Sequence, residues 1–337
     1  MSHPDQSQPL RGAIVGLGMM GRHHARLLQT SSRVVFAGAV DPGGDRHCAV
    51  RDAELVYPSI DELLERGRPD FAVVAVPTDE HLGVARALAA AGVHILIEKP
   101  LAGSAAEAEE IIAGCQGAGI RAAVGHVERF NPALIELRRR TEEGQVGEVF
   151  LIGTERCGPF PDRVKDVGVV KDLATHDLDL VGWLGKSAID VIAAQTVHKT
   201  GRTHEDLVLA TGRLQTGLAF SITVDWLTPT KIRRMRILGD RGMLVADTLT
   251  SDLVFHENGR VTSEWDSTQA MRGVAEGDST RYALQRREPL LVELEAFCDL
   301  VLGDDSSAAV SLAEGLQTVR CAEKVLESAR CMQTVRL

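Results

Sequence analysis

The sequence lacks a hydrophobic run long enough to cross a membrane, and it lacks an excess of positive charge. Its apolar runs fall well short of the roughly 18 residues that a membrane span needs, and the polar stretch 1–9 has no hydrophobic segment typical of a signal peptide. Its formal net charge at pH 7 is -10, whereas non-specific binding of nucleic acid requires a basic surface. We therefore expect a cytoplasmic protein that binds neither membranes nor nucleic acid.

Paired cysteines are also missing. The six cysteines include no C-x-x-C pair and no spacing typical of metal ligands. We therefore expect reduced thiols, no disulfide bond and no metal site. Hydrophobic residues make up 44% of the 337 residues, and a chain of this length usually forms more than one core. The composition thus predicts two globular domains.

The first third of the chain alternates short apolar runs with amphipathic segments. The runs are predicted to be buried parallel strands, and they cover residues 12–15, 34–40, 71–76, 94–97 and 120–124. Two intervening helices begin with a capping box at Ser59–Glu62 and Ser104–Glu107, where a hydroxyl and a carboxylate satisfy free amides. This alternation predicts a doubly wound parallel sheet.

The pattern changes near residue 148, after which β-rich segments follow one another with only turns between them. These segments are 148–155, 189–198, 207–214, 217–227, 231–238 and 242–248, and they predict a large, mainly antiparallel sheet. Helices are expected at 171–184, 289–302 and 311–330. We place the first domain at residues 10–125 and the second, an α/β domain, at 126–337. The last helix could pack back on the first domain.

A glycine-rich loop stands where the first predicted strand turns into a helix. The loop reads Gly16-Leu17-Gly18-Met19-Met20-Gly21. Glycines at this spacing permit a tight turn and let backbone amides approach a pyrophosphate. The loop, with Gly16, Gly18, Met19, Met20 and Gly21 as candidate contacts, therefore predicts a dinucleotide site.

Asp41 closes the second predicted strand, where a carboxylate can accept hydrogen bonds from the adenosine ribose and repel a 2′-phosphate. We therefore favour NAD over NADP as the cofactor. The alternative is that Asp41–Gly44 only forms a turn. Pro77, Thr78 and His81 follow the third strand and are candidate contacts on the nicotinamide side, although capping of the next helix explains them equally well.

Glu98, Lys99 and Pro100 end the fourth predicted strand, at the edge of the sheet where ligands bind. A lysine there can polarise a substrate oxygen or share its proton. Proline makes the Lys-Pro link rigid and allows it to be cis. The alternative is a lysine that is simply solvated.

Asp172 and His176 lie four residues apart on a predicted helix and therefore share one face. The carboxylate can orient the imidazole and stabilise its charged form, as a general base for a hydroxyl proton requires. A surface ion pair is the alternative interpretation of the spacing alone.

Taken together, these motifs resemble the glucose-fructose oxidoreductase / inositol dehydrogenase (Gfo/Idh/MocA) family of nicotinamide-dependent sugar and cyclitol oxidoreductases. The resemblance covers nearly the whole chain and includes Arg22–Ala25 after the glycine loop and the late helix 311–330. It implies a Rossmann domain followed by an α/β domain whose open sheet forms a homodimer or homotetramer. It also implies that Lys99 and His176 are catalytic, with Asp172 as the partner of His176 and Glu98 beside the cofactor.

Three segments resemble the branch that contains UDP-N-acetylglucosamine 3-dehydrogenases: 124–132, 158–168 and 226–231. The implied substrate contacts, in addition to Lys99, Asp172 and His176, are His126, Arg129, Asn131, Arg156, Arg163 and Lys231. Among these, Arg156, Arg163 and Lys231 could bind a diphosphate, or could be solvated surface cations. Before Asp172, the stretch 167–171 lacks the consecutive glycines common in the wider family.

We therefore expect an NAD-dependent dehydrogenase that oxidises a secondary hydroxyl of a hexose, at C3, to a ketone ahead of transamination. The substrate is a UDP-sugar or a sugar of an aminoglycoside, as in amino sugar or antibiotic biosynthesis. An inositol or cyclitol dehydrogenase is the alternative within the enzyme class. A nucleotide-sensing regulator without turnover is the alternative outside it, and the presence of Lys99, Asp172 and His176 disfavours it.

Overall fold

The computed structural model describes residues 9–161, 167–259 and 276–337. The chain forms two compact units, the first made of the chain up to Val127 together with Glu288–Arg320, and the second of Glu128–Arg287 together with Cys321–Leu337. The boundary expected at residues 125 and 126 lies close to the observed one. The segment 288–320 differs from expectation, because it belongs to the first unit.

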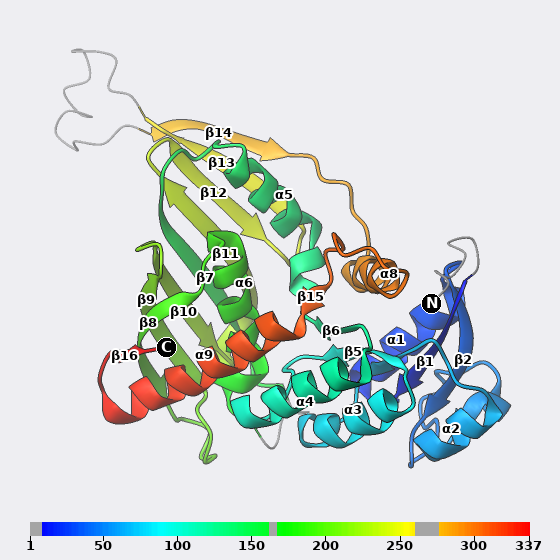
Figure 1. The fold of residues 1–337 in the computed structure, drawn as a ribbon. Coiled ribbons are helices and arrows are strands. Elements are labelled where there is room, and N and C mark those ends of the chain that lie inside the picture. The colour runs from blue at the N-terminus through cyan, green and yellow to red at the C-terminus, as the bar shows by residue number, and fades with distance from the viewer. Residues whose placement is uncertain (1–8, 162–166, 260–275) are drawn as a thin grey trace, which may run out of the picture. The chain divides into compact units, whose positions relative to one another are not determined.

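The first unit contains a seven-stranded sheet in the order β15-β6-β5-β4-β1-β2-β3 (Figure 1). Its strands are β1 (Leu10–Val15), β2 (Val34–Val40), β3 (Val56–Tyr57), β4 (Phe71–Val74), β5 (His94–Glu98), β6 (Ala122–Gly125) and β15 (Val310–Ser311). All pairs are parallel except β15 with β6. The five predicted strands and the doubly wound sheet are confirmed.

Helices cover both faces of this sheet, because its strands alternate apolar side chains between two cores. On one face α1 (Met19–Thr30) and α8 (Pro289–Val301) pack against residues such as Ile14 and Leu96. On the other, α2 (Ile60–Arg66), α3 (His81–Ala90), α4 (Ala105–Ala118) and the first part of α9 (Leu312–Cys331) pack against residues such as Val74. The apolar face of α8 explains why segment 288–320 joins this unit.

Both predicted capping boxes place a serine at a helix start. Ser59 Oγ accepts a hydrogen bond from the amide of Glu62, and Ser104 Oγ accepts one from the amide of Glu107, each at 3.3 Å. These bonds satisfy one free amide at the start of α2 and one at the start of α4. Each helix therefore begins where the sequence predicted.

The second unit contains a nine-stranded sheet in the order β14-β13-β12-β11-β7-β10-β9-β8-β16. Its strands are β7 (Val149–Pro159), β8 (Ile189–Val197), β9 (Leu207–Leu214), β10 (Ala219–Asp225), β11 (Leu227–Gly239), β12 (Gly242–Asp247), β13 (Asp252–Asn258), β14 (Glu276–Tyr282) and β16 (Val335–Arg336). Among the strands that the structure describes, only β7 and β10 pair in parallel, and the other seven pairs are antiparallel. The mainly antiparallel sheet is thus confirmed.

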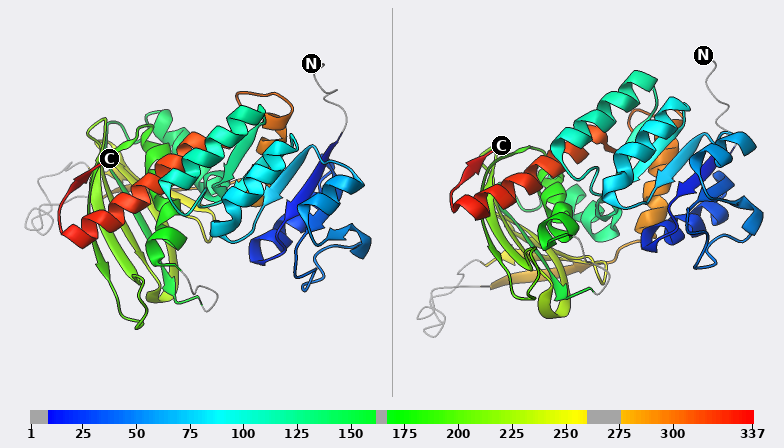
Figure 2. Two further views of the ribbon diagram at one scale, coloured as in Figure 1. Left: turned by 60° about the horizontal axis from the view of Figure 1, so that its bottom comes forward. Right: turned by 90° about the horizontal axis from the view of Figure 1, so that it is seen from below.

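One face of this second sheet is covered by helices (Figure 2). They are α5 (Pro132–Glu142), α6 (Thr175–Gly185) and the last part of α9, which share a core with strand residues such as Phe220 and Ile237. The helix predicted at 171–184 is present, although residues Val170–Ala174 form a π-helical turn before α6. The sequence analysis did not predict α5, β13 or β14.

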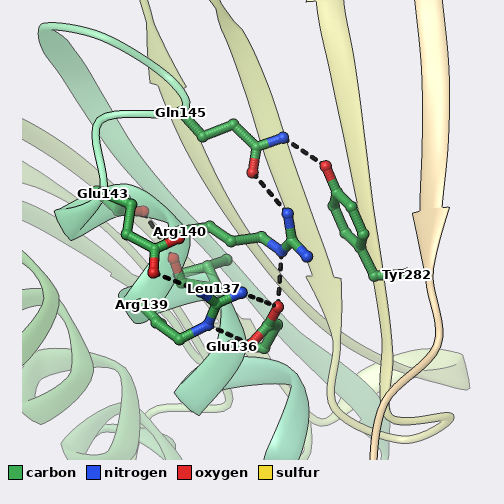
Figure 3. A network of polar contacts seen from close by, with 8 residues as sticks. Glu136, Leu137, Arg139, Arg140, Glu143, Gln145 and Tyr282 are labelled. Atoms are coloured by element: carbon green, nitrogen blue, oxygen red, sulfur yellow. Dashed lines mark hydrogen bonds and ion pairs between the residues drawn. The ribbon is translucent and has the colours of Figure 1, made fainter.

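Polar contacts connect helix α5 and the residues that follow it to the edge strand β14 (Figure 3). The Arg140 guanidinium lies 3.3 Å from the ring centroid of Tyr282 and donates to Glu136 at 2.7 Å and to Gln145 at 3.1 Å. Gln145 in turn donates to the hydroxyl of Tyr282. A charged arginine over an aromatic face, held by hydrogen bonds to Glu136 and Gln145, stabilises an otherwise exposed edge.

The helices and the cysteines bear on the expectations about membrane spans and disulfide bonds. Within the described ranges, no helix combines the length and the apolar character that crossing a bilayer requires. All six cysteines are free thiols, and four of them are buried.

Candidate active site

The three glycines of the loop after β1 have different surroundings. Gly16 has φ +93°, and a Cβ there would lie 2.6 Å from the carbonyl oxygen of Ala75; a Cβ on Gly21 would lie 1.8 Å from that of Gly16. Gly18 is exposed, and a Cβ on it would meet no atom within 4 Å. Gly16 and Gly21 therefore permit the tight turn, whereas Gly18 leaves open space over the loop.

The start of α1 is suited to an anion. Gly18 at the N-cap provides no side-chain cap, and the first turn of α1 contains no acidic residue. Met19 is exposed, and Met20 is half-buried. The free amides and the positive end of the helix dipole are thus available to a pyrophosphate, so the loop fits the dinucleotide that its sequence predicted.

Asp41, at the end of β2, is attached to the glycine loop. One carboxylate oxygen accepts a hydrogen bond from the amide of Leu17, and the other accepts one from the amide of Gly43, both at 2.8 Å. Asp41 therefore forms the turn that the alternative interpretation foresaw and also holds the loop. Each carboxylate oxygen has a second acceptor position that could bind a ribose hydroxyl.

The structure gives His81 a different role from a nicotinamide contact. Its ring is buried, with Nδ1 3.2 Å from the carbonyl oxygen of Leu101 and Nε2 3.2 Å from that of Val76. Burial lowers the pKa of His81 in spite of these bonds and the nearby charge of Glu98. The neutral ring carries one N–H and therefore donates a hydrogen bond to one of these two carbonyl oxygens. Pro77 is exposed and Thr78 is half-buried.

Glu98 is the last residue of β5 and is buried. Its Oε1 forms a 2.8 Å hydrogen bond with Nε2 of His24 from α1, and its Oε2 accepts one of 3.2 Å from the amide of Lys99. Burial alone would raise the pKa of Glu98, but the bond to His24 and the charge of Lys99 outweigh it and lower the pKa. Glu98 therefore acts within the protein and fixes the backbone that carries Lys99.

The Lys99–Pro100 peptide is cis, and Lys99 is half-buried. The glycine loop, Asp41, Thr78 and Lys99 follow β1, β2, β4 and β5, respectively. Parallel strands end at the same edge of a sheet, so these residues share one edge. The strand order reverses between β1 and β4, which is the switch point where open α/β sheets bind their ligands.

In the second unit, Asp172 lies in the π-helical turn and is buried, while His176 is the second residue of α6 and is half-buried. The two residues are thus on consecutive turns of one continuous helical segment, as predicted. Single π-helical turns are often found at functional sites.

Glu205, which the sequence analysis did not consider, holds the start of this segment. Its carboxylate accepts a 2.9 Å hydrogen bond from the amide of Val170, and its carbonyl oxygen accepts one of 3.0 Å from the amide of Val169. A Cβ on Gly168 would lie 2.0 Å from the Glu205 carboxylate. The single glycine before Asp172 was the signal that could have pointed to this close approach.

The structure argues against Arg156 as a ligand of a diphosphate. Its guanidinium is buried and donates to Asp177 at 2.7 Å and to Glu128 at 3.0 Å. Although burial opposes its charge, these carboxylates raise the pKa of Arg156. Two carboxylates therefore balance its charge within the unit, and that expectation is corrected.

The other predicted substrate residues have varied surroundings. Arg129 is buried and binds both carboxylate oxygens of Asp179, at 2.8 and 2.6 Å. Asn131 caps α5 through the amide of Ala133. His126, which follows β6, is buried, and Lys231 is exposed on β11. Arg163 lies outside the described residues.

Comparisons with known proteins agree with this arrangement. Residues 10–126 match the family model described as "Oxidoreductase family, NAD-binding Rossmann fold", and residues 134–245 match the "GFO/IDH/MocA C-terminal domain". The UDP-N-acetylglucosamine 3-dehydrogenase of Acidithiobacillus ferrooxidans is 30% identical over 296 residues, which are 87% of this chain and 88% of that protein. The solved structure of that enzyme has a TM-score of 0.83 and covers 96% of this chain and 98% of that one.

Two other matches are more distant. Inositol 2-dehydrogenase 2 of Saccharopolyspora erythraea is 27% identical over 57% of this chain and 59% of its own length. The structure of GenD2 from gentamicin A biosynthesis, in complex with NAD, has a TM-score of 0.79 and is 21% identical; it covers 100% of this chain and 99% of that one. At that identity the likeness to GenD2 concerns the fold.

Proposed function

Because the chain belongs to the Gfo/Idh/MocA family and is thus an NAD-dependent oxidoreductase acting on CH–OH groups, we propose that it oxidises the C3 hydroxyl of a hexose to a ketone. The observation that carries the substrate class is the 30% identity to a UDP-N-acetylglucosamine 3-dehydrogenase over 87% of the chain. Under this proposal, the substrate is a nucleotide sugar, and the ketone is the product that a later transamination would consume.

The first unit would hold NAD through the loop of Gly16, Gly18 and Gly21 and through Asp41. The open space over Gly18 and the uncapped start of α1 support a pyrophosphate there. The spare acceptor positions of Asp41 support binding of the adenosine ribose. NAD bound there would supply the acceptor for the hydride of the carbon that bears the hydroxyl.

The proposed proton chemistry belongs to His176 and Lys99. His176 accepts the hydroxyl proton as the C–H bond breaks, and the carboxylate of Asp172, four residues earlier, stabilises the charged imidazole. Lys99 donates a hydrogen bond to the same oxygen while negative charge develops on it. In the reverse direction, His176 returns the proton to the ketone oxygen.

The first test is the absorbance of NADH formed from NAD with UDP-N-acetylglucosamine, UDP-glucose, myo-inositol or a hydroxylated aminoglycoside. Lys99→Met and His176→Gln should each lower kcat by about 10²- to 10⁴-fold, the usual contribution of proton transfer, with little change in NAD affinity. Lys324→Met on α9 and His256→Gln on β13 serve as matched controls. Full turnover in both site variants would disprove the catalytic roles.

A cyclitol dehydrogenase is the second candidate, favoured by the similarity to an inositol 2-dehydrogenase over 57% of the chain. Lys231 distinguishes the two, because an exposed lysine could bind a diphosphate but has no such partner on a cyclitol. Lys231→Ala should raise KM for a UDP-sugar several-fold more than KM for myo-inositol. Activity with myo-inositol alone would replace the first proposal by the second.

Self-association is also part of the proposal. The helices of the second unit contribute to a core on one face of its sheet, whereas Leu209 and Thr223 point to the opposite face and are exposed or half-exposed. This face supports a homodimer or homotetramer, which sedimentation would distinguish from a monomer.

A further inference from the structure

The first unit contains a buried acid that the proposed chemistry does not use. Glu293 lies on the buried face of α8, next to Leu294 and one turn from Leu290 and Phe297, all of which belong to the apolar core beneath α1. Glu293 is only 2% exposed. Neither carboxyl oxygen has a hydrogen-bond partner among the described residues.

Glu98 ends β5 two residues after Leu96, so both side chains lie on the same face of the sheet, and Leu96 shares a core with Leu294 of α8. The charge of Glu98 acts on Glu293. Glu98 is bonded to His24, and Nδ1 of His24 is likewise buried without a partner in the described part of the chain. The other charged or titratable side chains around Glu98 are His81 from α3 and Lys99. Three ionisable residues from α1, β5 and α8 thus come together behind the strand end that carries Lys99.

The remaining titratable groups of α8 are Glu295, Cys298 and Asp299, and none of them carries a positive charge that could offset an ionised Glu293. Asp299 binds Arg33 at 2.6 Å near the surface. Burial raises the pKa of the Cys298 thiol to about 12, so that group is neutral at physiological pH. No cation among the described residues forms a hydrogen bond with the Glu293 carboxyl group.

Two carboxyl groups that share a buried region do not both ionise easily, because each negative charge opposes the other and burial opposes both. Glu98 has a donor in His24, an amide donor in Lys99 and the positive charge of Lys99, so it is the one that ionises. Glu293 has none of these. Burial and the charge of Glu98 raise its pKa well above the usual value.

We propose that Glu293 is a positioning residue that keeps its proton beside ionised Glu98, so that Glu98 retains its bonds to His24 and to the backbone of Lys99. Ionisation of Glu293 would place a second negative charge beside Glu98 and displace the strand end that carries Lys99. The positioning role depends on the proposed catalytic role of Lys99, whereas the retained proton does not.

The retained proton is tested by stability, without substrate. The unfolded chain releases the Glu293 proton near pH 4.3, whereas the folded chain keeps it, so the folding equilibrium constant falls by up to about tenfold per pH unit above that range until Glu293 ionises in the folded state. Glu293→Gln removes this decrease of the folding equilibrium constant with pH, because an amide does not ionise. Its melting temperature, measured between pH 5 and 8, should therefore rise progressively above that of the wild type.

Asp299→Asn, on the exposed side of the same helix, is the matched control, and its melting temperature should follow the wild-type pH dependence. Parallel curves for Glu293→Gln and the wild type would show that Glu293 holds no extra proton and would overturn the proposal.

The positioning role is tested by the pH profile of kcat. Glu293→Gln should match the wild type in kcat at pH 7 within about twofold and in NAD affinity, and should keep its kcat to higher pH, because the neutral amide cannot ionise. Superimposed profiles, together with a confirmed stability difference, would overturn the positioning role. Full activity of Lys99→Met would instead disprove the proposed catalytic role of Lys99 and leave the stability result intact.

Discussion

At the scale of single residues, the glycine loop shows that one motif can serve several purposes. Gly16 and Gly21 are required by backbone atoms only 2.6 and 1.8 Å from where a Cβ would lie, whereas nothing lies near a Cβ on Gly18. The sequence pattern gives all three positions equal weight. The structure distinguishes the glycines that make the turn from the glycine that leaves space for a ligand.

Gly21→Ala and Gly18→Ala should therefore fail in different ways. Gly21→Ala should lower the free energy of unfolding by about 2 kcal/mol or more, because its Cβ overlaps the carbonyl oxygen of Gly16. Gly18→Ala should leave stability nearly unchanged but weaken NAD binding by about tenfold, since its methyl group occupies the space over the loop. Thermal unfolding and titration with NAD measure the two effects.

Equal stability loss in both alanine variants would contradict this division of roles. Unchanged NAD affinity in Gly18→Ala would show that the pyrophosphate does not approach this glycine.

Asp206 is a second residue whose role only the structure reveals. Its carboxylate accepts hydrogen bonds from the amides of Lys199 and Thr200, the hydroxyl of Thr200 and the indole of buried Trp226, at 2.6 to 2.9 Å. Burial opposes its charge, but these four donors outweigh burial and lower the pKa of Asp206 to about 2.

Stability should therefore fall in acid. The folded pKa of Asp206 is below the unfolded value of about 3.9, so its contribution of about 2 kcal/mol is present above pH 5 and is lost as pH falls from about 4 to 2. Asp206→Asn should be less stable than the wild type at pH 7, and the difference should close near pH 2. Denaturant unfolding at several pH values measures this, with Asp278→Asn on exposed β14 as the control. A constant difference across this range would contradict the assignment.

At the scale of elements, periodicity and capping predicted most of the regular structure. The strands at 34–40 and 207–214 have the predicted bounds, because continuous or alternating apolar residues specify them locally. Helix α5 was missed because its surface carries Arg138, Arg139 and Arg140 and its few apolar residues face a partner sheet that the sequence does not display. The edge strand β14 was missed for a similar reason, since six of its seven residues are exposed.

Glu205 holds the start of the helical segment that carries Asp172 and His176. Glu205→Ala should leave the buried amide of Val170 unsatisfied and cost about 1–3 kcal/mol of stability. Because this amide begins the segment that carries Asp172 and His176, kcat should fall more than NAD affinity. Glu205→Gln, which keeps an acceptor oxygen, should restore most of both properties. Equal kcat in the alanine variant and the wild type would show that Glu205 does not orient the segment.

At the scale of the whole molecule, the chain returns to its first unit after completing most of the second. Helix α8 contributes Leu290, Leu294 and Phe297 to the core beneath α1. A chain cut at residue 125 would therefore leave the first unit without helix α8, which completes its core. Residues far apart in sequence complete the unit expected to bind the cofactor.

A chain that ends at Arg287 should therefore lose NAD binding, although it retains every residue of the glycine loop. Loss of these three large apolar side chains from the core should lower the free energy of unfolding by on the order of 5 kcal/mol, which is comparable with the total stability of many domains. Soluble yield and NAD titration test this. Removal of residues 333–337, which deletes only β16 at the sheet edge, should preserve binding. Normal NAD binding by the shorter chain would contradict the discontinuous unit.

The sequence by itself determined the doubly wound and antiparallel sheets, the glycine loop and the placement of Asp172 and His176 on one helical segment, because these features depend on patterns of residues within a few positions of one another. It did not determine that Arg156 is neutralised by Asp177 and Glu128, that His81 is buried between two carbonyl oxygens, or that the carboxyl group of Glu293 is buried within reach of the charge of Glu98. Those facts depend on which distant side chains meet, and on the burial that sets their charge. Only the tertiary structure decides both.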